Sequence, residues 1–488
     1  MKSTLSPLFL LFIVFICSCS KKPDNAIVPQ LGTIAISGIH QADTLKGTIT
    51  AQVNLTGSVQ PSKLEIYAND SLIVTSTKAP YNLQWNTLGV KDGNYKLKAI
   101  AYDNSGKQTQ VALDVVINNV LVTLIIDPHI NSIYTNIIYI VTDSAGNLLN
   151  SVKYNGTDKV IKIGSTKPNL NTRCSVFEVK TDPSPQTYVT GYMTIPKGSA
   201  WDLTGITEVQ PDKYYNSSLT FTNLPSFTRM TISTDEGGFT FNTPEAVGNI
   251  TNYGFSSTTK EFVQYVDANN NGHYGFFPLD IMQSNIAMNL ADSTFNNSVK
   301  KTISIPGATS INVSLYGRWN KSFYSYYVLD NTFYQNANAT YFYPDGNYLT
   351  DYISSVYYVQ NGWTYWNDYS SLPPDAVAPF GTTVTINNNT LGSFDFTAQG
   401  AFDYYNAVFS DAANRIYVSI NSPAAYTSFR FPNILGLTNI ANEPLNNLKP
   451  YTFTLFKVPG FNERKLIYYN TNEYPAYTLP SQSATKYF

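Results

Sequence analysis

The sequence has little charge, few histidines and almost no cysteine. Charged residues make up 13% of the 488 residues, against roughly 25% in an average soluble protein, and the net charge is −2. Without an excess of lysine and arginine, we expect no binding to nucleic acid. The three histidines lie far apart, and no zinc-protease, serine-hydrolase or phosphate-loop motif is present, so the sequence gives no support for catalysis or for a cofactor.

Cysteine usage excludes a disulfide within the body of the chain. Two of the three cysteines lie close to the N-terminus, which leaves Cys174 alone in the remaining sequence. Cys174 stands in a strand-like stretch, Arg173 to Phe177, with no histidine nearby to activate it. We therefore expect a buried, unreactive thiol.

The N-terminal segment has the organisation of an export signal. A positive start at Lys2 precedes an apolar run from Leu8 to Ile16, which is too short to span a bilayer comfortably. The run ends in Ile16-Cys17-Ser18-Cys19, which resembles the lipobox of bacterial lipoproteins. The resemblance implies a signal peptide over 1–18, acylation of Cys19 and a lipidated tether over 19–32. Cys17 fits less well as the acceptor because bulky Ile16 would occupy the cleavage position.

The lipobox resemblance also implies a compartment and a partner. Each buried methylene contributes about 0.8 kcal/mol, so several acyl chains hold a protein on a membrane where one chain does not. Ser20 rather than aspartate follows Cys19, which by resemblance to lipoprotein sorting rules implies the outer membrane. The periplasmic and the cell-surface face both stay open. An ordinary signal peptide and an uncleaved anchor helix are the alternatives to lipidation.

Residues 33–118 show a regular alternation of apolar and polar side chains. This period of two, interrupted by turn signals such as Asp92-Gly93-Asn94 and Asp103-Asn104-Ser105-Gly106, predicts short strands of a β-sandwich. The alternating apolar positions are Ala51, Val53, Leu55, Leu64, Ile66, Ala68, Leu97, Ala99, Ala101, Val111, Leu113 and Val115.

The same stretch resembles the bacterial Ig-like domains appended to surface proteins and secreted glycoside hydrolases. The resemblance lies in Lys63 to Asp70, Ala79 to Trp85, Asp92 to Tyr95 and Ala99 to Gly106, and it covers about a sixth of the chain. It implies a spacer or adhesion module and no catalytic activity.

The rest of the chain is also rich in strand-forming residues. We predict an all-β, multi-domain protein: the Ig-like sandwich is followed by two or more further antiparallel sandwich domains. The expected regions are a β-sandwich over 119–205, a β-rich domain over 206–296 and an aromatic-rich β-sandwich region over 297–488.

A weak internal echo runs through the last 270 residues. An alternating strand, a turn and a second strand recur where Leu219–Pro225 leads into Phe227, where Ile303–Ala308 leads into Ile311, and where Phe394–Gly400 leads into Phe402. The echo fits tandem sandwiches that each open with the same hairpin, and it fits coincidence among hairpins equally well.

Aromatic residues concentrate between 319 and 369, with asparagine and aspartate among them. Strand alternation places Trp363 and Tyr365 on one face and Trp366 on the other. Together with Trp319, these three are our candidate ligand-binding residues, because sugar rings stack on aromatic faces and their hydroxyls need polar neighbours. Protein recognition also uses such surfaces, and cross-strand aromatic pairs that only stabilise a sheet are the structural alternative.

Asp267-Ala268-Asn269-Asn270-Asn271-Gly272 matches the opening of a calcium loop, with Asp267, Asn269 and Asn271 as candidate ligands. The closing glutamate is absent because Pro278 occupies the twelfth position. Since Asn271-Gly272 is a strong hairpin signal, we expect a turn rather than a metal site.

These observations favour a membrane-anchored, non-enzymatic binding or adhesion lipoprotein, with a glycan or a protein as its ligand. A carbohydrate-active enzyme with an Ig-like accessory domain is the first alternative, since glycosidase carboxylates need no local motif. Four aspartates of the aromatic region could supply such a pair, although turn and edge roles explain them equally well: Asp330, Asp345, Asp351 and Asp368. A structural component of a surface assembly is the second alternative.

Overall fold

The computed structural model describes residues 31–57, 59–87, 90, 93–126, 133–165, 172–184, 186–203, 215–235, 237–243, 249–254, 258–280, 283, 285–318, 326–346, 348–411, 415–432, 448–462 and 481–488. Within these residues the protein is all-β, with 3-10 turns at Leu290–Asp292 (η4) and Leu391–Ser393 (η5). None of their helical segments has the length and apolarity that crossing a membrane requires. The chain divides into two compact units, Met1–Asn119 and Val120–Phe488. The segment in which we predict a signal peptide lies outside the described residues, and so does Cys19.

The first unit is a sandwich of two sheets with one core between them. The five-stranded sheet consists, in spatial order, of β2 (Thr44–Leu45), β8 (Gln108–Ile117), β7 (Gly93–Tyr102), β4 (Lys63–Ala68) and β5 (Ser71–Ser76). The three-stranded sheet consists of β1 (Ile34–Ser37), β3 (Thr48–Leu55) and β6 (Tyr81–Asn86). Alternate side chains of β4 and β6, among them Leu64, Ile66 and Trp85, are buried in the core. The predicted Ig-like sandwich is confirmed.

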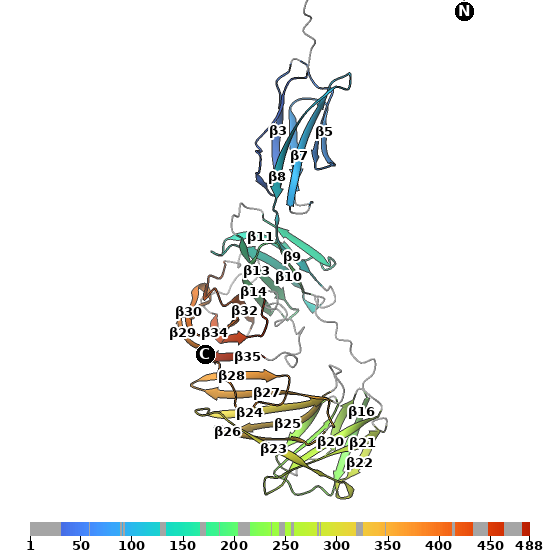
Figure 1. Cartoon of the computed structure of the whole chain (residues 1–488), viewed down its shortest axis with the longest axis vertical. Helices are drawn as coiled ribbons and strands as arrows, with labels where there is room; N and C mark the ends of the chain where they lie inside the picture. Colours follow the sequence, from blue (N-terminus) through green and yellow to red (C-terminus); the bar gives the residue numbers. More distant parts are fainter. Residues whose placement is uncertain are drawn as a thin grey trace, which may run out of the picture. The chain divides into compact units, whose positions relative to one another are not determined.

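The second unit is built on one long sheet of twelve strands. Its spatial order is β11 (Leu148–Lys153), β10 (Asn136–Thr142), β13 (Arg173–Thr181), β14 (Thr187–Pro196), β32 (Ile416–Pro423), β31 (Tyr404–Ser410), β34 (Lys449–Lys457), β35 (Ser481–Tyr487), β28 (Trp363–Tyr369), β27 (Asp351–Gln360), β24 (Ser310–Arg318) and β25 (Tyr327–Tyr334). The two pairings that join its parts, β14 with β32 and β28 with β35, can be followed in Figure 1. The first is parallel and joins residues separated by more than 220 positions, for example Thr187 and Ile416.

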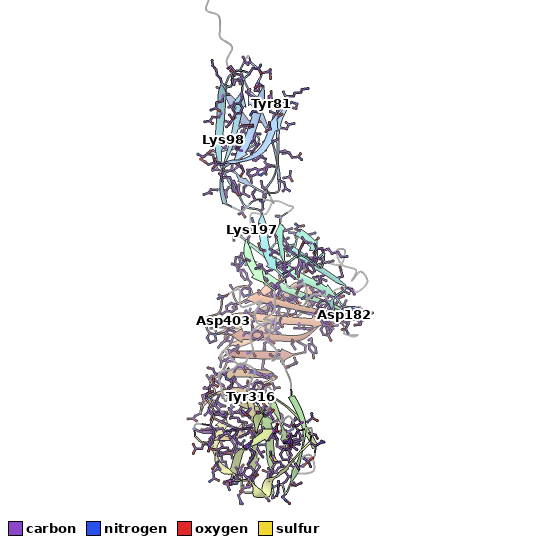
Figure 2. The ribbon with its side chains drawn as sticks, turned by 90° about the vertical axis from the view of Figure 1, so that its right-hand side faces the viewer. Tyr81, Lys98, Asp182, Lys197, Tyr316 and Asp403 are labelled. Atoms are coloured by element: carbon purple, nitrogen blue, oxygen red, sulfur yellow. The ribbon has the colours of Figure 1, made fainter. Side chains whose placement is uncertain are left out.

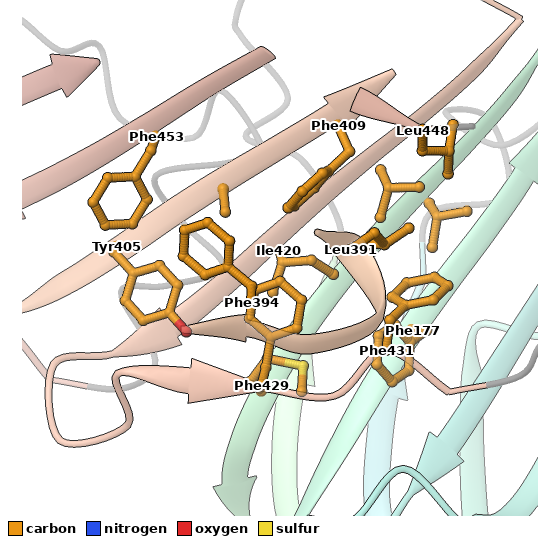
Figure 3. Packing of buried hydrophobic residues seen from close by; sticks show 14 of the residues in the cluster. Phe177, Leu391, Phe394, Tyr405, Phe409, Ile420, Phe429, Phe431, Leu448 and Phe453 are labelled. Carbon is orange, nitrogen blue, oxygen red and sulfur yellow. The ribbon is translucent and has the colours of Figure 1, made fainter. Parts of the chain in front are cut away.

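Two small sheets cover opposite faces of one end of the long sheet. The sheet on one face consists of β12 (Val160–Gly164), β9 (Val120–Ile125) and β15 (Ser199–Asp202). The sheet on the other face consists of β29 (Thr383–Asn388), β30 (Phe394–Gln399) and β33 (Ser428–Phe429). Consequently β13 is buried on both faces: Val176 enters the core beneath β9, while Phe177 enters the core beneath β30. Figure 3 shows Phe177 in this second core, which also holds Phe394 and Phe453.

The other end of the long sheet packs against a six-stranded sheet, whose opposite face is covered by a three-stranded sheet. The six-stranded sheet contains β18 (Gly237–Phe241), β17 (Arg229–Thr234), β20 (Thr258–Val266), β21 (Gly272–Asp280), β23 (Asn296–Ser304) and β26 (Asn338–Pro344). The three-stranded sheet contains β19 (Asn249–Gly254), β16 (Tyr215–Thr222) and β22 (Asn285–Asn289). Where β17 meets β25, Arg229 pairs with the fully buried Asp330 at 2.9 Å, and the Phe342 N–H donates to the same carboxylate. The pair lets charged groups remain inside the protein, where either one alone would be strongly destabilising.

Each copy of the internal echo contains two strands that lie in different, facing sheets, and so it does not form a hairpin. In each of its three copies the two strands belong to different sheets: β16 and β17, β23 and β24, and β30 and β31. The side chains of each pair meet in one core, as Leu219 and Ile232 do. Local alternation predicts the strands but does not distinguish a pair that exchanges hydrogen bonds from one that faces its partner across a core.

Strand pairing crosses the limits that we expected for the domains. The pairing of β14 with β32 joins the region 119–205 to the region 297–488 in one sheet. The domain boundaries that we expected at residues 205 and 296 stay predictions. The Ig-like unit has a pair of sheets and a core of its own.

Cys174 is buried in β13, where desolvation raises the pKa of its thiol to about 12.

Candidate ligand-binding site

The aromatic residues of β28 divide between the core and the surface. Trp363 and Tyr365 turn inward: Tyr365 stacks on Tyr358 at 4.8 Å between ring centroids, and Trp363 meets Phe453 edge-on at 6.4 Å. Trp366 points to the opposite face, and 43% of its surface is exposed. Trp319, the fourth predicted residue, lies outside the described residues. Of the candidates that the structure describes, Trp366 is the most exposed.

A buried carboxylate holds the indole of Trp366 in place. The indole N–H donates to Asp368 Oδ1 at 2.6 Å, and the ring of Tyr357 packs edge-on against the indole at 5.8 Å. Asp368 also accepts hydrogen bonds from the hydroxyls of Ser355 and Ser481. Because the indole has a fixed partner on the sheet, a ligand that stacks on it does not have to immobilise it first.

Burial raises the pKa of the Asp368 carboxyl, because the surroundings disfavour its charged form. The hydroxyls of Ser355 and Ser481 and the indole N–H of Trp366 oppose this shift by donating to the carboxylate. The Ser355 hydroxyl, the Ser481 hydroxyl and the Trp366 indole N–H all donate to the Asp368 carboxylate. Asp368 therefore affects the site by fixing the orientation of the Trp366 indole. The sequence contains a signal for this role, since residues i and i+2 of a strand point to the same face.

We call the surface that carries Trp366 the outer face: it comprises the side chains of β25, β24, β27, β28, β35 and β34 that point away from the cores. Short polar side chains dominate it and bond to one another across strands. Examples are Thr454 with Thr485 at 2.9 Å and Ser314 with Asn331 at 3.2 Å. Such cross-strand pairs stabilise a sheet while leaving hydroxyl and amide groups at its surface.

A cleft of about 700 Å³ lies where β28 and β34 end and where β31 and β35 begin. It contains two carboxylates, Asp368 and Asp403, together with Lys457. The Val458 N–H donates to Asp403 at 2.6 Å. Asp403 directly precedes β31 in the sequence and is labelled in Figure 2. Burial lowers the pKa of Lys457, whose ammonium donates to the Phe380 carbonyl and lies 4.5 Å from the centre of the Phe380 ring. Lining residues from the adjoining segments are Tyr369, Pro374, Ala376, Ala378, Ala401, Phe402, Val458, Pro459, Gly460, Ser481 and Gln482.

The candidate calcium loop forms the turn between β20 and β21. Asp267 accepts hydrogen bonds from the backbone N–H groups of Asn269 and Asn271, at 2.9 and 2.8 Å, and lies 3.6 Å from His273. The same arrangement holds the turns that start at Asp103 and Asp143. No cluster of three or more metal-ligating side chains of the His, Cys, Asp or Glu type occurs in the part of the chain that the structure describes. The carboxylate of Asp267 is thus engaged in a turn, as the Asn-Gly signal led us to expect.

Two of the other aspartates of the aromatic region form ion pairs. Asp330 pairs with Arg229, and Asp351 forms a two-pronged ion pair with Arg318. The Tyr274 hydroxyl donates to the backbone carbonyl of Asp345. Of the four carboxylates considered from the sequence, the cleft therefore contains Asp368.

Comparison with known proteins places the first unit in a family. The sequence model of the bacterial Ig domain matches residues 25–99. No curated protein matches the chain.

Several solved structures are similar to the chain, each at a low TM-score. The fibronectin(III)-like modules of CbhA from Clostridium thermocellum share 25% identity over 17% of this chain and 94% of theirs, with a TM-score of 0.16. SGBP-B of the Bacteroides ovatus mixed-linkage glucan utilization locus, solved with a mixed-linkage heptasaccharide, shares 11% identity over 64% of this chain and 92% of its own, with a TM-score of 0.15. A Ca²⁺-stabilized ice-binding adhesin of an Antarctic bacterium shares 10% identity over 72% and 100%, also at 0.15. Superposition this poor supports no conclusion about function, whereas the sequence match and the sandwich together identify the N-terminal part of the chain as a bacterial Ig domain.

Proposed function

We propose that this chain is a non-enzymatic binding or adhesion protein that meets its ligand with the outer face of the long sheet. The observation that carries the proposal is the exposed indole of Trp366, which Asp368 and Tyr357 hold on a surface of hydroxyl and amide groups. An oriented, half-exposed tryptophan is the kind of residue that contributes most to binding free energy. A glycan suits this surface, because its rings can stack on the indole while its hydroxyls bond to serine, threonine and asparagine.

The location is part of the same proposal. A bacterial Ig domain supports a cell-surface or extracellular site of action. Acyl chains on Cys19 would anchor the chain to the outer membrane, and the tether over 19–32 with the Ig domain would serve as the spacer. Replacing Cys19 with serine should release the protein from the membrane fraction, and continued attachment of the C19S variant would refute this anchor.

A glycan array probed with the full-length chain in detergent tests the binding function. We expect signal on one or more glycans, and a strong decrease in the Trp366→Ala variant. Phe239→Ala is the matched control, because Phe239 on β18 is an aromatic residue of comparable exposure, 49%, on another sheet. A uniformly blank array would remove the support for a glycan ligand.

A carbohydrate-active enzyme is a second candidate function, supported by the cleft with Asp368 and Asp403. Glycoside hydrolysis uses two carboxyl groups that flank the bond to be cleaved, and a raised pKa suits the one that donates the proton. Release of reducing sugar ends from a bound glycan, abolished by Asp403→Asn, would favour the enzyme. Binding without product release would favour the adhesion protein.

A further inference from the structure

Four aromatic residues of the outer face, on β25, β27, β28 and β34, lie in one line across the strands. Strand register places Phe333 opposite Asn312, Asn312 opposite Tyr357, and Tyr357 opposite Trp366. The line continues through Ser483 to Phe456. We call these six residues the aromatic row. Since directly opposed residues of antiparallel strands share a face, the row is one continuous strip perpendicular to β25, β24, β27, β28, β35 and β34.

The accessible part of the row has aromatic residues at both ends. Phe333 is 54% exposed and Trp366 is 43% exposed, and Tyr357 is half-buried between them. At strand spacings of roughly 4.8 Å, the three steps from β25 to β28 separate Phe333 from Trp366 by about 14 Å. Beyond Phe456 the register reaches Tyr404, which is buried beneath the stacked ring of Phe461. The row is therefore exposed at the Phe333 end and covered at the Tyr404 end.

Two rows of short side chains run parallel to the aromatic row, one on each side. The first contains a buried carboxylate among polar groups: Asn331, Ser314, Ser355, Asp368 and Ser481. The second contains one valine among polar groups: Val359, Thr364, Thr485, Thr454 and Asn406. Asp368 is the one carboxylate of the three rows, and it accepts hydrogen bonds from Ser355, Trp366 and Ser481. The three rows contain no lysine or arginine.

This absence of exposed charge decides which ligand the strip fits. An acidic glycan, a nucleic acid or a charged peptide would find no countercharge here and would lose its hydration on contact. A neutral chain of hydroxylated rings meets what the strip offers, namely ring faces along the middle and neutral hydrogen-bonding groups along both sides. Sugar rings in an extended chain also repeat at a length comparable to the strand spacing, so consecutive rings can meet consecutive strands.

We propose that the aromatic row binds a neutral, extended, unbranched polysaccharide that runs across the strands, with one sugar ring stacked on Trp366 and another near Phe333. The inference rests on the proposed binding function and specifies its ligand class and direction. Asp368 is a positioning residue in this site, because it fixes the indole and is itself covered. A polymer bound in this way contacts Phe333 and Trp366 at once, which links the two contacts into one binding event.

Affinity gel electrophoresis of the full-length chain in detergent tests the row. The probes are three neutral polymers, hydroxyethylcellulose, xylan and mannan, and one acidic polymer, polygalacturonate. We expect at least one neutral polymer to retard the wild type, with affinity decreased at least about tenfold in Trp366→Ala and in Phe333→Ala. Trp366→Phe should retain more affinity than Trp366→Ala because it keeps a ring, and Phe239→Ala should bind like the wild type.

Each other outcome has a separate meaning. Retardation by a neutral polymer that both row variants retain in full would overturn the row and leave the proposed binding function standing. Retardation by polygalacturonate alone would overturn the neutral ligand class in the same way. Retardation by no polymer, together with a blank glycan array, would overturn both the row and glycan binding. Circular dichroism of each variant shows whether a loss of affinity comes from a loss of fold.

Discussion

The two ends of the twelve-stranded sheet are covered differently. At one end β13 lies between two small sheets, so that Val176 and Phe177 are both buried although they point in opposite directions. At the other end β28 has a core beneath Trp363 and Tyr365, while Trp366 on its second face remains exposed. The same sheet is thus buried on both faces at one end and exposed on one face at the other. Which role a strand has depends on the number of layers that cover it.

The largest expected effect contrasts one phenylalanine from each end. Phe177→Ala should decrease the free energy of unfolding by about 3–5 kcal/mol, because it removes a ring from a core packed on all sides. Phe333→Ala should change it by less than about 1 kcal/mol, since that ring is 54% exposed. Urea unfolding followed by circular dichroism measures both. Equal losses would contradict the difference in covering.

A second contrast tests how closely the buried end is packed. A Cβ atom added at Gly191 of β14 would lie 2.7 Å from Ile420 Cδ1 and 2.8 Å from Phe177 Cε1. Gly191→Ala should therefore destabilise the second unit by about 1–3 kcal/mol through overpacking. Gly392→Ala is the matched control, because nothing lies within 4 Å of its added Cβ atom. If Gly191→Ala left the free energy of unfolding unchanged in the same urea titration, this core would have to accommodate an added methyl group without strain.

At the exposed end, Trp366→Ala should cost about 1 kcal/mol of stability, since it removes one of three donors from a buried carboxylate. Its effect on glycan affinity should exceed its effect on stability. Thermal and urea unfolding, compared with affinity electrophoresis of the same preparation, separates the two effects. A stability loss as large as that of Phe177→Ala would mean that Trp366 is a core residue.

The smallest effect concerns pH. Burial raises the pKa of Asp368 above its ordinary value of 3.8, so the folded chain binds this proton more tightly than the unfolded chain does. Its contribution to stability is therefore greatest below pH 3.8 and decreases as pH rises through the raised folded pKa. Asp368→Asn removes this dependence, so the stability of the variant relative to the wild type should increase over that window and then level off. Unfolding of both proteins over a pH series measures this, and parallel profiles would refute it.

Much of the fold follows from local sequence, and the exceptions have physical causes. Alternation at Leu64, Ile66 and Ala68 predicts the strands of the Ig domain, because one face of each strand meets a core and the other meets water. Alternation fails in β13, where Ser175, Val176 and Phe177 are all buried, because both faces are covered. The pairing of β14 with β32 has no local signal, since it joins residues separated by more than 220 positions.

The candidate site could be predicted only in part. The period of two separates Trp366 from Trp363 and Tyr365, and it places Asp368 on the same face as Trp366. The aromatic row needs the register of six strands, and Phe333, Tyr357 and Phe456 fall in line with Trp366 only once that register is known. Register depends on turns and on long-range packing, which the local pattern does not encode.

The position of β35 has a consequence for how the protein is made. This strand pairs with β34 on one side and with β28 on the other, so it closes a gap between two halves of the long sheet. Until Ser481–Tyr487 has been synthesised, β28 and β34 each lack a hydrogen-bonded neighbour on the side that this strand occupies. A chain that stalls before this point would expose two unpaired strand edges, which can pair with other chains and aggregate. Pairing of the seven-residue strand β35 removes both edges.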